Sequence, residues 1–481
     1  MKSGFYLGIA AALGIAAPAI ADDFERDASL RAAEAWMTKQ MEIRLAPGAT
    51  AALVHDQDVI WSAAYGAADV DAGVAMTPQT DFSVCSISKL FTSIGVMTLV
   101  EGGHIDLDAP LSTYLPDYAL SGEARKGSGP VTVRDMLSHA SGLPREPLQA
   151  GWLDRDFPTA AELRADLRAN AADYEPGENF QYSNLAMSLL GEVIAAASGQ
   201  SYDAYMRAAV LGPLGLDGVS TDLPMTAEAD RSFARGYSMY DRAGQRTALP
   251  PYQLRGYAPA AGYAASVSDL ARFASWQFRL LESGETEVLS RPALRDMHRV
   301  HWHDPFDPAG GTFGFGFAHS KMNDMPLIGH NGYCNGYRAN FAMHPAKRIA
   351  VISMVNANDI SPHDLSAGVL AIALPTLAAA SEDGDKKASA ARSFADYEGS
   401  YSVKDMPWGS YILPRGDGVI MIDLFADEPM KYPMKFVHIE GDTFRLKRPE
   451  GDMGARLTFD RDADGKVIGS TFEGVRMPKS G

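Results

Sequence analysis

The chain has 481 residues, of which 46% are hydrophobic and 21% charged, so it can bury a large core and has the composition of a globular protein. Its 60 acidic and 43 basic residues give a formal net charge of −17, which repels phosphate backbones and argues against nucleic acid as a partner. No fixed-period repeat and no phosphate-binding loop ending in Lys-Ser/Thr is present in the sequence.

The N-terminal segment has the features of a secretory signal peptide. Lys2 precedes a run of Gly, Ala, Leu and Ile, and the run ends in Ala-Ile-Ala at 19–21 before two aspartates. An uncleaved membrane anchor is the alternative, because about 18 apolar residues can just span a bilayer. Pro18 and the abrupt acidic turn favour cleavage. We therefore expect a signal peptide over 1–21 and a periplasmic or secreted protein without a later membrane span.

Residues 22–379 alternate helical and strand-like patterns, which predicts one mixed domain. Two segments have apolar residues at helical spacing and end at glycine, and three segments are strand-like and bounded by turn residues. The helices are expected over 88–103 and 184–199, and the strands over 51–66, 337–345 and 348–356. Strands at both ends and helices between them predict a sheet that is closed by both termini of the domain and packed under helices. The expected fold class is α/β (α+β).

The composition changes in the last hundred residues. Residues 380–392 are charged or small and have no periodicity, which is typical of a linker. From 393 to 481 the pattern becomes short alternating strands separated by turn signals. A segment of this kind predicts a small antiparallel barrel or sandwich.

Ser86 and Lys89 form the strongest candidate for chemistry. On a helix, positions i and i+3 share a face, so the hydroxyl and the amine would be neighbours. A serine hydroxyl needs an adjacent base, and a lysine can serve if burial or nearby positive charge lowers its pKa. A helix N-terminus also aims backbone N–H groups at a developing oxyanion. Taken alone, the four-residue pattern is compatible with a chance occurrence in which Lys89 extends to solvent.

Two further motifs add candidate residues. Tyr182 and Asn184 lie just before a predicted helix, where a tyrosine can relay a proton and an amide can hold a lysine and a substrate carbonyl. The alternative is a buried tyrosine followed by a helix N-cap. His330 and Gly332 are expected to open a strand whose glycine lets a ligand approach the backbone, or to form a strand-end turn.

In this order, Ser86-x-x-Lys89, Tyr182-x-Asn184 and His330-x-Gly332 resemble the motifs of the serine β-lactamase and penicillin-binding-protein-like superfamily. That group includes class C β-lactamases, D,D-carboxypeptidases, D-aminopeptidases and β-lactamase-like carboxylesterases. The resemblance covers nearly all of residues 30–360. It implies a β-lactamase/transpeptidase-like antiparallel sheet flanked by helices, with a helical subdomain. The C-terminal barrel is similar to lipocalin-like accessory domains, and would be either a structural accessory or a wall of the substrate cleft.

The resemblance also implies a role for each matching residue. Ser86 would be the acylated nucleophile, and Lys89 and Tyr182 would share the general acid and base work. Substrate binding would fall to Asn184, His330, Gly332 and Tyr333, with the backbone N–H groups of Ser86 and Tyr333 forming the oxyanion hole.

His330 departs from the lysine of typical β-lactamases. Without that fixed cation, a carboxylate-bearing β-lactam is held less firmly. Arg338 is a candidate replacement anchor, and the alternative for it is a strand-edge arginine in a surface ion pair.

The chain has two cysteines, Cys85 next to the nucleophile and Cys334 next to the His330 motif. The resemblance to class A carbapenemases, a more distant branch, implies a disulfide between them that pins the nucleophile's helix to the oxyanion strand. An oxidising compartment permits this bond. The alternative is two small buried hydrophobic residues, the usual environment of free cysteine.

Two other stretches have some of the features of metal sites. The histidine-rich stretch 298–304 lacks companion ligands elsewhere in the sequence. The aspartate-rich stretch 460–465 begins like a calcium loop but has Thr471 in place of the final glutamate, and we interpret it as a hairpin turn. We expect neither a metal nor a cofactor.

The leading interpretation is an exported serine hydrolase that forms an acyl-enzyme at Ser86 and hydrolyses an amide or ester. A peptidase or esterase for small or D-amino-acid-containing substrates ranks first. The alternatives are a β-lactamase or D,D-carboxypeptidase acting on β-lactams or peptidoglycan stem peptides, and a penicillin-binding sensor without turnover. The expected partner is a small-molecule or short-peptide substrate, and the sequence leaves the oligomeric state open. The sequence has no G-x-S-x-G elbow, which argues against an α/β-hydrolase.

Overall fold

The computed structural model describes residues 24–116, 129–167, 173–224, 232–284, 287–304, 311–377, 390–403, 406 and 408–480. The predicted signal peptide over 1–21 and residues 380–389 of the predicted linker lie outside these residues. Contacts divide the chain into two compact units. The larger unit holds residues 33–374 and 423–432, and the smaller holds 375–422, 433–481 and the start of the chain up to Ala32.

The larger unit contains a mixed set of helices and strands. Its described strands are β1 (Gly48–His55), β2 (Asp58–Asp69), β3 (Val74–Ala75), β4 (Phe82–Ser83), β5 (Ala264–Ala265), β6 (Trp302–His303), β7 (Thr312–Phe313), β8 (Ala318–Met322), β9 (Met325–Cys334), β10 (Tyr337–His344) and β11 (Ile349–Val355). Its described helices are α2 (Ser88–Glu101), α3 (Val133–Leu137), α4 (Ala160–Leu167), α5 (Asn184–Ser198), α6 (Tyr202–Met206), α7 (Ala258–Ala261), α8 (Val267–Ser283), α9 (Arg291–His298) and α10 (Pro362–Ala373). Helix α1 (Phe24–Ile43) begins in the smaller unit.

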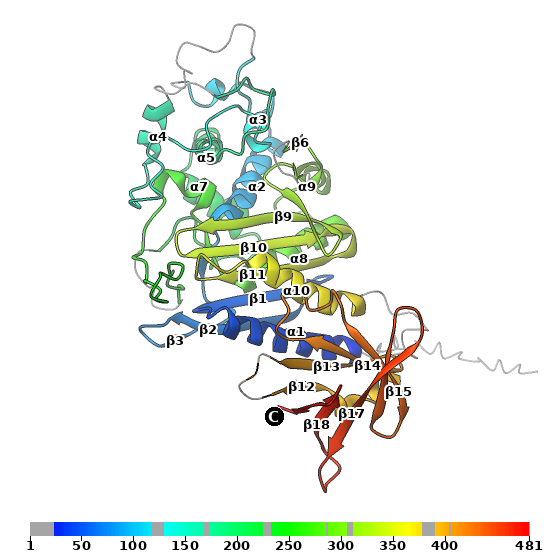
Figure 1. Ribbon diagram of the computed structural model, residues 1–481. Helices are drawn as coiled ribbons and strands as arrows, with labels where there is room; N and C mark the ends of the chain where they lie inside the picture. The colour runs from blue at the N-terminus through cyan, green and yellow to red at the C-terminus, as the bar shows by residue number, and fades with distance from the viewer. Residues whose placement is uncertain are drawn as a thin grey trace, which may run out of the picture. The chain divides into compact units, whose positions relative to one another are not determined.

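The main sheet brings together the two ends of the larger unit. Its described strands follow the order β3-β2-β1-β11-β10-β9-β8-β7-β6, and β1 pairs antiparallel with both β2 and β11 (Figure 1). The turn between β1 and β2 passes through Asp56, whose φ of 57° is tolerated by aspartate in tight turns. The expectation of a sheet closed by both termini of the domain is confirmed.

Helices cover both faces of this sheet. Adjacent residues of a strand point to opposite faces, and Asn340 and Phe341 of β10 show which helix lies on which side. Asn340 Nδ2 donates a hydrogen bond to Ser366 Oγ of α10 at 2.8 Å, whereas the Phe341 ring lies 5.5 Å from that of Phe273 of α8. Helices α8 and α10 therefore pack on opposite faces.

A helical layer formed by α2, α5 and α7 continues from the α8 face. Small residues let these helices approach one another closely. A Cβ atom at Gly191 of α5 would lie 2.3 Å from Pro259 of α7, and one at Gly95 of α2 would lie 3.3 Å from Ile194 of α5 and 2.4 Å from Met206 of α6. This close packing holds the start of α2 and the start of α5 in a fixed arrangement, and both helix starts carry candidate site residues.

The smaller unit contains an eight-stranded antiparallel sheet in its described residues. The strands are β12 (Gly399–Ser402), β13 (Gly409–Arg415), β14 (Gly418–Asp423), β15 (Met434–Glu440), β16 (Thr443–Lys447), β17 (Met453–Arg461), β18 (Val467–Phe472) and β19 (Val475–Pro478). A bridge between Tyr401 and Lys479 joins the first strand to the last, so the sheet is nearly closed around an aromatic core. The expected C-terminal antiparallel barrel is confirmed.

Helix α1 contributes to both units. Within the smaller unit, Arg31 makes two hydrogen bonds to Glu398, at 2.6 and 2.9 Å. Within the larger unit, Trp36 Nε1 donates to the carbonyl of Ala426 at 2.9 Å, and Gln40 Nε2 donates to that of Leu424 at 3.0 Å. The segment 423–432 thus belongs to the larger unit through side chains of α1. Among the described helices, none is long and apolar enough to cross a membrane.

Candidate active site

Ser86, Lys89 and Tyr182 meet at the start of α2. Ser86 lies in a short 3₁₀ turn, η1 (Cys85–Ile87), and Lys89 follows in the first turn of the helix. Lys89 Nζ donates a hydrogen bond to Ser86 Oγ at 3.1 Å, and Tyr182 Oη donates to the same oxygen at 3.0 Å. One partly exposed hydroxyl is therefore in contact with both an amine and a phenol.

The Lys89 amine is fully buried and has no carboxylate partner among the described residues. Its second hydrogen bond goes to the carbonyl oxygen of Ala260 in α7, at 2.8 Å. Burial lowers the pKa of Lys89 well below its ordinary value, the negative charge of Glu146 acts against this, and the positive charge of Arg145 reinforces it. An amine in this environment favours its neutral form, which has a free lone pair.

The pKa of Tyr182 is shifted in the opposite direction to that of Lys89. Burial raises the pKa of the Tyr182 phenol, although the hydrogen bond to Ser86 and the charge of Arg145 oppose the shift. Its ring packs 4.5 Å from that of His139, a fully buried residue whose Nδ1 accepts the backbone N–H of Ser183 at 3.2 Å. That bond fixes the residue next to Tyr182, so the phenol is held in place as a neutral proton donor.

Asn184 is held by a carboxylate. It begins α5, after Ser183 caps the helix by accepting the N–H of Ala186 at 2.9 Å. Asn184 Nδ2 donates to Glu146 Oε1 at 2.7 Å, and Tyr257 donates its hydroxyl to Glu146 Oε2. A carboxylate can only accept hydrogen bonds, so Glu146 sets the orientation of the Asn184 amide.

His330 lies inside the site as a neutral imidazole. Its Nδ1 lies 2.6 Å from the carbonyl oxygen of Asn331, which requires the proton to be on Nδ1. Burial, followed by the nearby Lys89, lowers the pKa of His330 to about 3. The sequence prediction placed His330 at the start of a strand, and this is wrong: β9 begins at Met325, because 325–329 pair with β8.

Gly332 allows a close approach between β9 and the nucleophile turn. A Cβ atom there would lie 2.3 Å from the carbonyl oxygen of Val84 and 3.2 Å from Cys85 Cβ. Strand β8 pairs with β9 only as far as Gly329, so the next stretch of that strand edge is unpaired in the described chain. The Cys334–Tyr337 pair closes the hairpin with β10, which directs the backbone of Tyr333 toward this free edge.

Arg338 lies on the other face of the sheet. It is directly opposite Tyr333 in the β9–β10 ladder, so the two side chains share a face, and the guanidinium carbon lies 5.5 Å from the Tyr333 ring centroid. His330 pairs with Phe341 on the α8 face instead. The hypothesis that Arg338 replaces a lysine as a carboxylate anchor in the site is therefore wrong, because its side chain points to the face of the sheet opposite the site.

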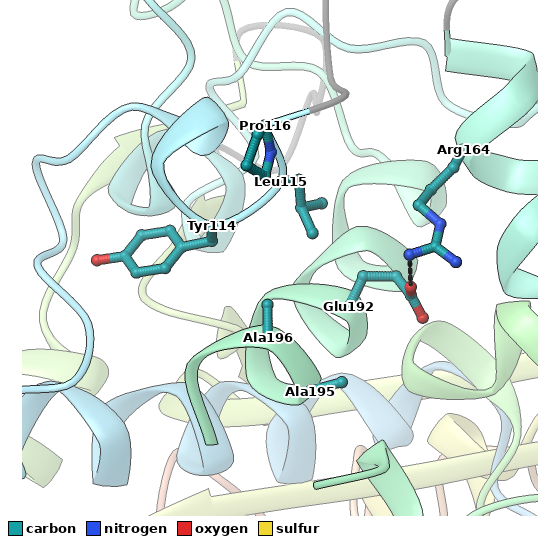
Figure 2. Close-up of a pocket in the computed structure, with 7 residues that line it drawn as sticks. All are labelled: Tyr114, Leu115, Pro116, Arg164, Glu192, Ala195 and Ala196. Carbon is teal, nitrogen blue, oxygen red and sulfur yellow. Dashed lines mark ion pairs between the residues drawn. The ribbon is translucent and has the colours of Figure 1, made fainter. Parts of the chain in front are cut away.

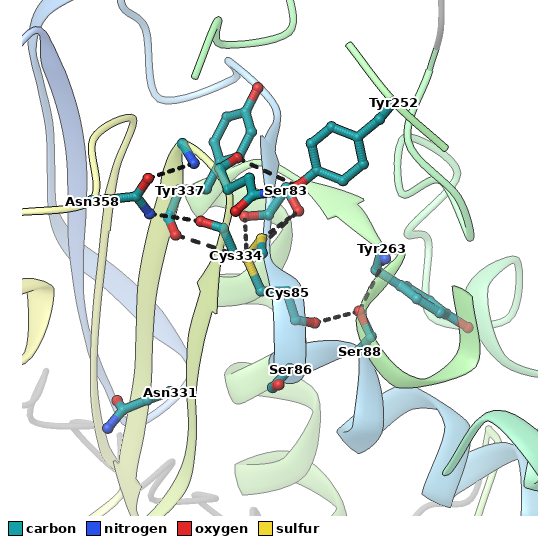
Figure 3. The surroundings of a disulfide bond; sticks show 12 residues. Ser83, Cys85, Ser86, Ser88, Tyr252, Tyr263, Asn331, Cys334, Tyr337 and Asn358 are labelled. Carbon is teal, nitrogen blue, oxygen red and sulfur yellow. Dashed lines mark hydrogen bonds between the residues drawn. A yellow bond between two sulfur atoms is a disulfide. The ribbon is translucent and has the colours of Figure 1, made fainter. Parts of the chain in front are cut away.

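A disulfide joins Cys85 to Cys334, as the family resemblance implied, with 5.8 Å between their Cα atoms. Figure 3 shows that it connects η1 to β9 beside Ser86, while Asn331 points from the opposite side of the strand. Cys85 has a φ of 51°, in the left-handed region that only a well-constrained non-glycine residue occupies. The covalent bond and the Gly332 contact together constrain the residue that precedes the nucleophile.

Two charged residues of the site escaped the sequence analysis. The Arg145 guanidinium carbon lies 4.9 Å from the Tyr182 ring centroid, and Arg145 Nε lies 3.4 Å from Glu146 Oε1. In the sequence this pair follows Gly-Leu-Pro and is typical of a solvated turn. The available signal was only its position shortly after a segment, 132–143, that resembles the family.

The stretches with metal-like spacing make protein contacts. In the histidine-rich stretch, His298 Nε2 lies 2.9 Å from Gln277 Oε1, and His301 stacks on Phe315 with 3.7 Å between ring centroids. In the aspartate-rich stretch, Asp462 accepts the backbone N–H of Lys466 at 2.8 Å, within the turn between β17 and β18.

A separate pocket lies farther along α5. It has a volume of about 200 Å³ and lies between Tyr114, Leu115 and Pro116 on one side and α5 on the other (Figure 2). An ion pair of 3.2 Å between Arg164 and Glu192 borders it. None of the predicted site residues lines this pocket.

Comparisons with known proteins agree with this geometry. The family model described as Beta-lactamase matches residues 33–373, which is more than half of the chain. The solved octameric penicillin-binding protein homologue from Pyrococcus abyssi is 26% identical, with a TM-score of 0.62 over 93% of this chain and 99% of that chain. The D-amino acid amidase from Ochrobactrum anthropi SV3, solved with D-phenylalanine, is 24% identical, with a TM-score of 0.60 over 72% of this chain and 99% of that chain.

Among curated proteins, "Protein flp" of Staphylococcus aureus (strain N315) is 22% identical over 312 residues, which are 65% of this chain and 60% of that protein. The chain thus spans about 60% of the length of this curated relative. The match of the family model over 33–373 and the likeness of fold lead to one conclusion. The chain belongs to the beta-lactamase family.

Proposed function

We propose that this chain is an exported serine hydrolase that forms an acyl-enzyme at Ser86 and hydrolyses an amide or an ester, with small or D-amino-acid-containing substrates preferred. The observation that carries the proposal is the contact of Ser86 Oγ with both Lys89 Nζ, at 3.1 Å, and Tyr182 Oη, at 3.0 Å. The family match supports it, and the fold of a D-amino acid amidase supports the substrate class.

The opposite pKa shifts of Lys89 and Tyr182 assign their roles. Burial lowers the pKa of Lys89, so its neutral amine is the base that takes the Ser86 proton as Oγ bonds to the acyl carbon. Burial raises the pKa of Tyr182, so its phenol stays protonated and donates its proton to the departing amine or alcohol. Lys89 then returns the serine proton to the Tyr182 phenolate, because the acylated Ser86 oxygen can no longer carry it. Water attacks the resulting ester by the same route in reverse.

The backbone N–H groups of Ser86 and Tyr333 are the proposed oxyanion donors. The N–H groups at a helix start have no intrahelical partner, and the backbone of Tyr333 is directed to the free edge of β9. Each such donor contributes about 10²–10³-fold to the rate of acyl transfer in other serine hydrolases.

The state of His330 supports ranking a peptidase or esterase above a β-lactamase. Its imidazole is neutral, and its Nδ1 proton is already bonded to the carbonyl of Asn331. It therefore offers neither a charge nor a free N–H group to a substrate carboxylate.

Export and domain organisation are part of the proposal. The signal-like sequence at 1–21 and the Cys85–Cys334 disulfide both support a periplasmic or secreted protein. We propose a hydrolase domain over 22–379, a linker over 380–392 and a C-terminal barrel domain over 393–481.

The test is a side-by-side assay of a short-chain aryl ester, D-alanyl p-nitroanilide and a chromogenic cephalosporin, with Ser86→Ala as the blank. We expect turnover of the ester and the anilide that exceeds the blank, and slower turnover of the cephalosporin. Covalent labelling by a penicillin followed by a burst without sustained turnover of any substrate would favour a sensor. Failure of a fluorophosphonate probe to label Ser86 in correctly folded protein would overturn the proposal.

A further inference from the structure

Arg145 places its permanent positive charge over the ring of Tyr182. Its guanidinium carbon lies 4.9 Å from the centroid of the Tyr182 ring, and its side chain is 62% exposed. One face of the guanidinium therefore covers the ring, while the rest of the side chain remains in solvent. A cation over an aromatic face at this distance is attracted by the ring, which stabilises the stacked arrangement.

The backbone of Arg145 is anchored to the same helix start that carries Tyr182. The Arg145 carbonyl oxygen accepts the N–H of Asn184 at 2.8 Å and lies 3.3 Å from that of Leu185. These are N–H groups of the first turn of α5, which have no partner inside the helix. Because the loop is bonded to this turn, the guanidinium is held above Tyr182.

Glu146 is the charge that opposes Arg145. Its carboxylate lies 3.4 Å from Arg145 Nε and also accepts hydrogen bonds from Asn184 and Tyr257. It is therefore fixed on the side of the ion pair nearer to α5 and η4 (Arg255–Tyr257).

Burial shifts the other titratable groups around the site toward their uncharged forms. Burial lowers the pKa values of Lys89, His139 and His330 and raises the pKa values of Tyr182 and Tyr257. These groups come from α2, the loop after α3, β9, the segment before α5 and η4. Among the described residues at the site, the fixed charges are thus the cation of Arg145 and the anion of Glu146.

We propose that Arg145 is a positioning residue for catalysis: its charge, stacked on Tyr182, favours the proton-free form of Lys89 and the release of the Tyr182 proton. The inference rests on the proposed function, in which Lys89 accepts the serine proton and Tyr182 donates one. A positive charge disfavours protonated amines and favours deprotonated phenols, so one guanidinium assists both steps. The pKa shifts have the signs that this role requires: Arg145 lowers the pKa values of Lys89 and Tyr182, whereas Glu146 raises both.

The first experiment is the pH profile of kcat/KM for p-nitrophenyl acetate, with Ser86→Ala as the blank. The base must be unprotonated, so activity rises with pH through the pKa of Lys89. Removing the positive charge raises that pKa, and we expect Arg145→Gln to move the acid limb upward by about 0.5 to 1 pH unit. Arg145→Lys should restore most of the shift, and Glu146→Gln should move the limb in the opposite direction.

Arg338→Gln is the matched control. Its guanidinium is also stacked on a tyrosine, 5.5 Å from the Tyr333 ring centroid, but on the other face of the sheet. We expect its acid limb to coincide with that of the wild type. High salt screens exposed charges, so 1 M NaCl should move the wild-type limb toward that of Arg145→Gln and leave the variant nearly unchanged.

A second measurement does not depend on turnover. Lysine labelled with ¹³C at Cε reports the titration of Lys89 by NMR, and Lys89→Met assigns the signal. A higher midpoint in Arg145→Gln than in the wild type would support the inference. Equal Lys89 midpoints in Arg145→Gln and the wild type would overturn the inference. So would a pH profile in which Arg145→Gln keeps Ser86-dependent turnover and its acid limb does not move. A shift in Arg338→Gln as large as that in Arg145→Gln would overturn it as well. Absence of any Ser86-dependent turnover would instead count against the proposed function, and the NMR comparison would still decide the role of Arg145.

Discussion

Each unit of the molecule packs a basic side chain against a tyrosine, and the two basic groups are in different chemical environments. In the barrel, the guanidinium carbon of Arg461 lies 5.3 Å from the ring centroid of Tyr397. In the larger unit, Lys89 Nζ lies 5.0 Å from the ring centroid of Tyr182. Arg461 also bonds to Asp442 at 2.8 Å and to Asp396 at 3.2 Å, whereas the hydrogen bonds of Lys89 within the described residues go to a hydroxyl and a backbone carbonyl.

The difference shows how burial and ion pairing set the charge state of a basic side chain. The hydrogen bonds to Asp442 and Tyr397 raise the pKa of Arg461, so it stays charged and forms ion pairs within the barrel. Burial without a carboxylate lowers the pKa of Lys89, so it can exist as a neutral base. The aromatic neighbour is common to both. Lys89 differs from Arg461 in being fully buried and in having no carboxylate partner among the described residues, and burial is the larger cause of its pKa shift.

The largest expected effect comes from replacing Lys89 with methionine. We expect kcat/KM for an aryl ester to fall by about 10²–10⁴-fold, the usual contribution of a general base. Stability should be unchanged or slightly higher, because a buried amine carries a desolvation cost that a methionine side chain of similar length does not. Ester assays and thermal unfolding test the two halves of the prediction. Retained activity, or a large loss of stability, would contradict it.

The second largest effect is expected from removing the disulfide, which is present in the larger unit and absent from the barrel. Both cysteines of the chain lie in the larger unit, so the barrel has no covalent cross-link. We expect the double variant Cys85→Ala/Cys334→Ala to lower the free energy of unfolding of the larger unit by about 2–4 kcal/mol. Urea unfolding with and without reductant measures this, and reduced wild type should match the variant. Hydrogen exchange in barrel peptides should not change, and faster exchange there would contradict the prediction.

Gly332→Ala probes the tight contact of the site. Its new Cβ would lie 2.3 Å from the Val84 carbonyl oxygen, so β9 must move away from the nucleophile turn. Displacement of catalytic groups by about 1 Å can cost 10²-fold, and we expect a loss of that order in kcat/KM. Gly469→Ala in β18 is the control, because the nearest atoms to its Cβ would be 3.3 Å away. Equal activity of the two variants would show that the close approach is unimportant.

The smallest effect is expected from Arg461→Met in the barrel. The side chain is 27% exposed and its ion pairs are partly solvated, so its loss should destabilise the barrel by about 0.5–1 kcal/mol. Hydrogen exchange in the barrel measures this, and ester hydrolysis should be unchanged. A loss of activity comparable with that of Lys89→Met would remove the distinction between the structural and the reactive cation.

Local patterns were sufficient to predict much of the fold. The helix expected over 184–199 is α5, and it ends where Gly199 adopts the left-handed conformation with a φ of 69°. The predicted hairpin strands correspond to β10 and β11. Such elements are set by short-range spacing and turn residues, which are visible in a single sequence.

Features that depend on strand pairing were not predictable in the same way. The face on which Arg338 lies follows from the register of β9 and β10, and a shift of one residue would reverse it. The beginning of β9 at Met325 depends on pairing with β8, and Pro326 in the second position obscured it.

The candidate site was predictable only in its sequence motifs. Ser86, Lys89 and Tyr182 lie in motifs that resemble a known family, and the structure brings the three side chains together. Arg145 and Glu146 have no such pattern. Their proximity to Tyr182 arises from the bonds of a loop to the start of α5, which is a tertiary contact.

The disulfide also has a consequence for the order of events during biosynthesis. Its two cysteines are 249 residues apart in the chain. At roughly 5–20 residues per second, Cys85 is translated about 12–50 seconds before its partner. Throughout that interval the nucleophile turn lacks both the covalent tie and the strand that completes the oxyanion hole. Hydrolytic competence should therefore be acquired late, after most of the larger unit has been synthesised, and a nascent chain that ends before Cys334 should be inert.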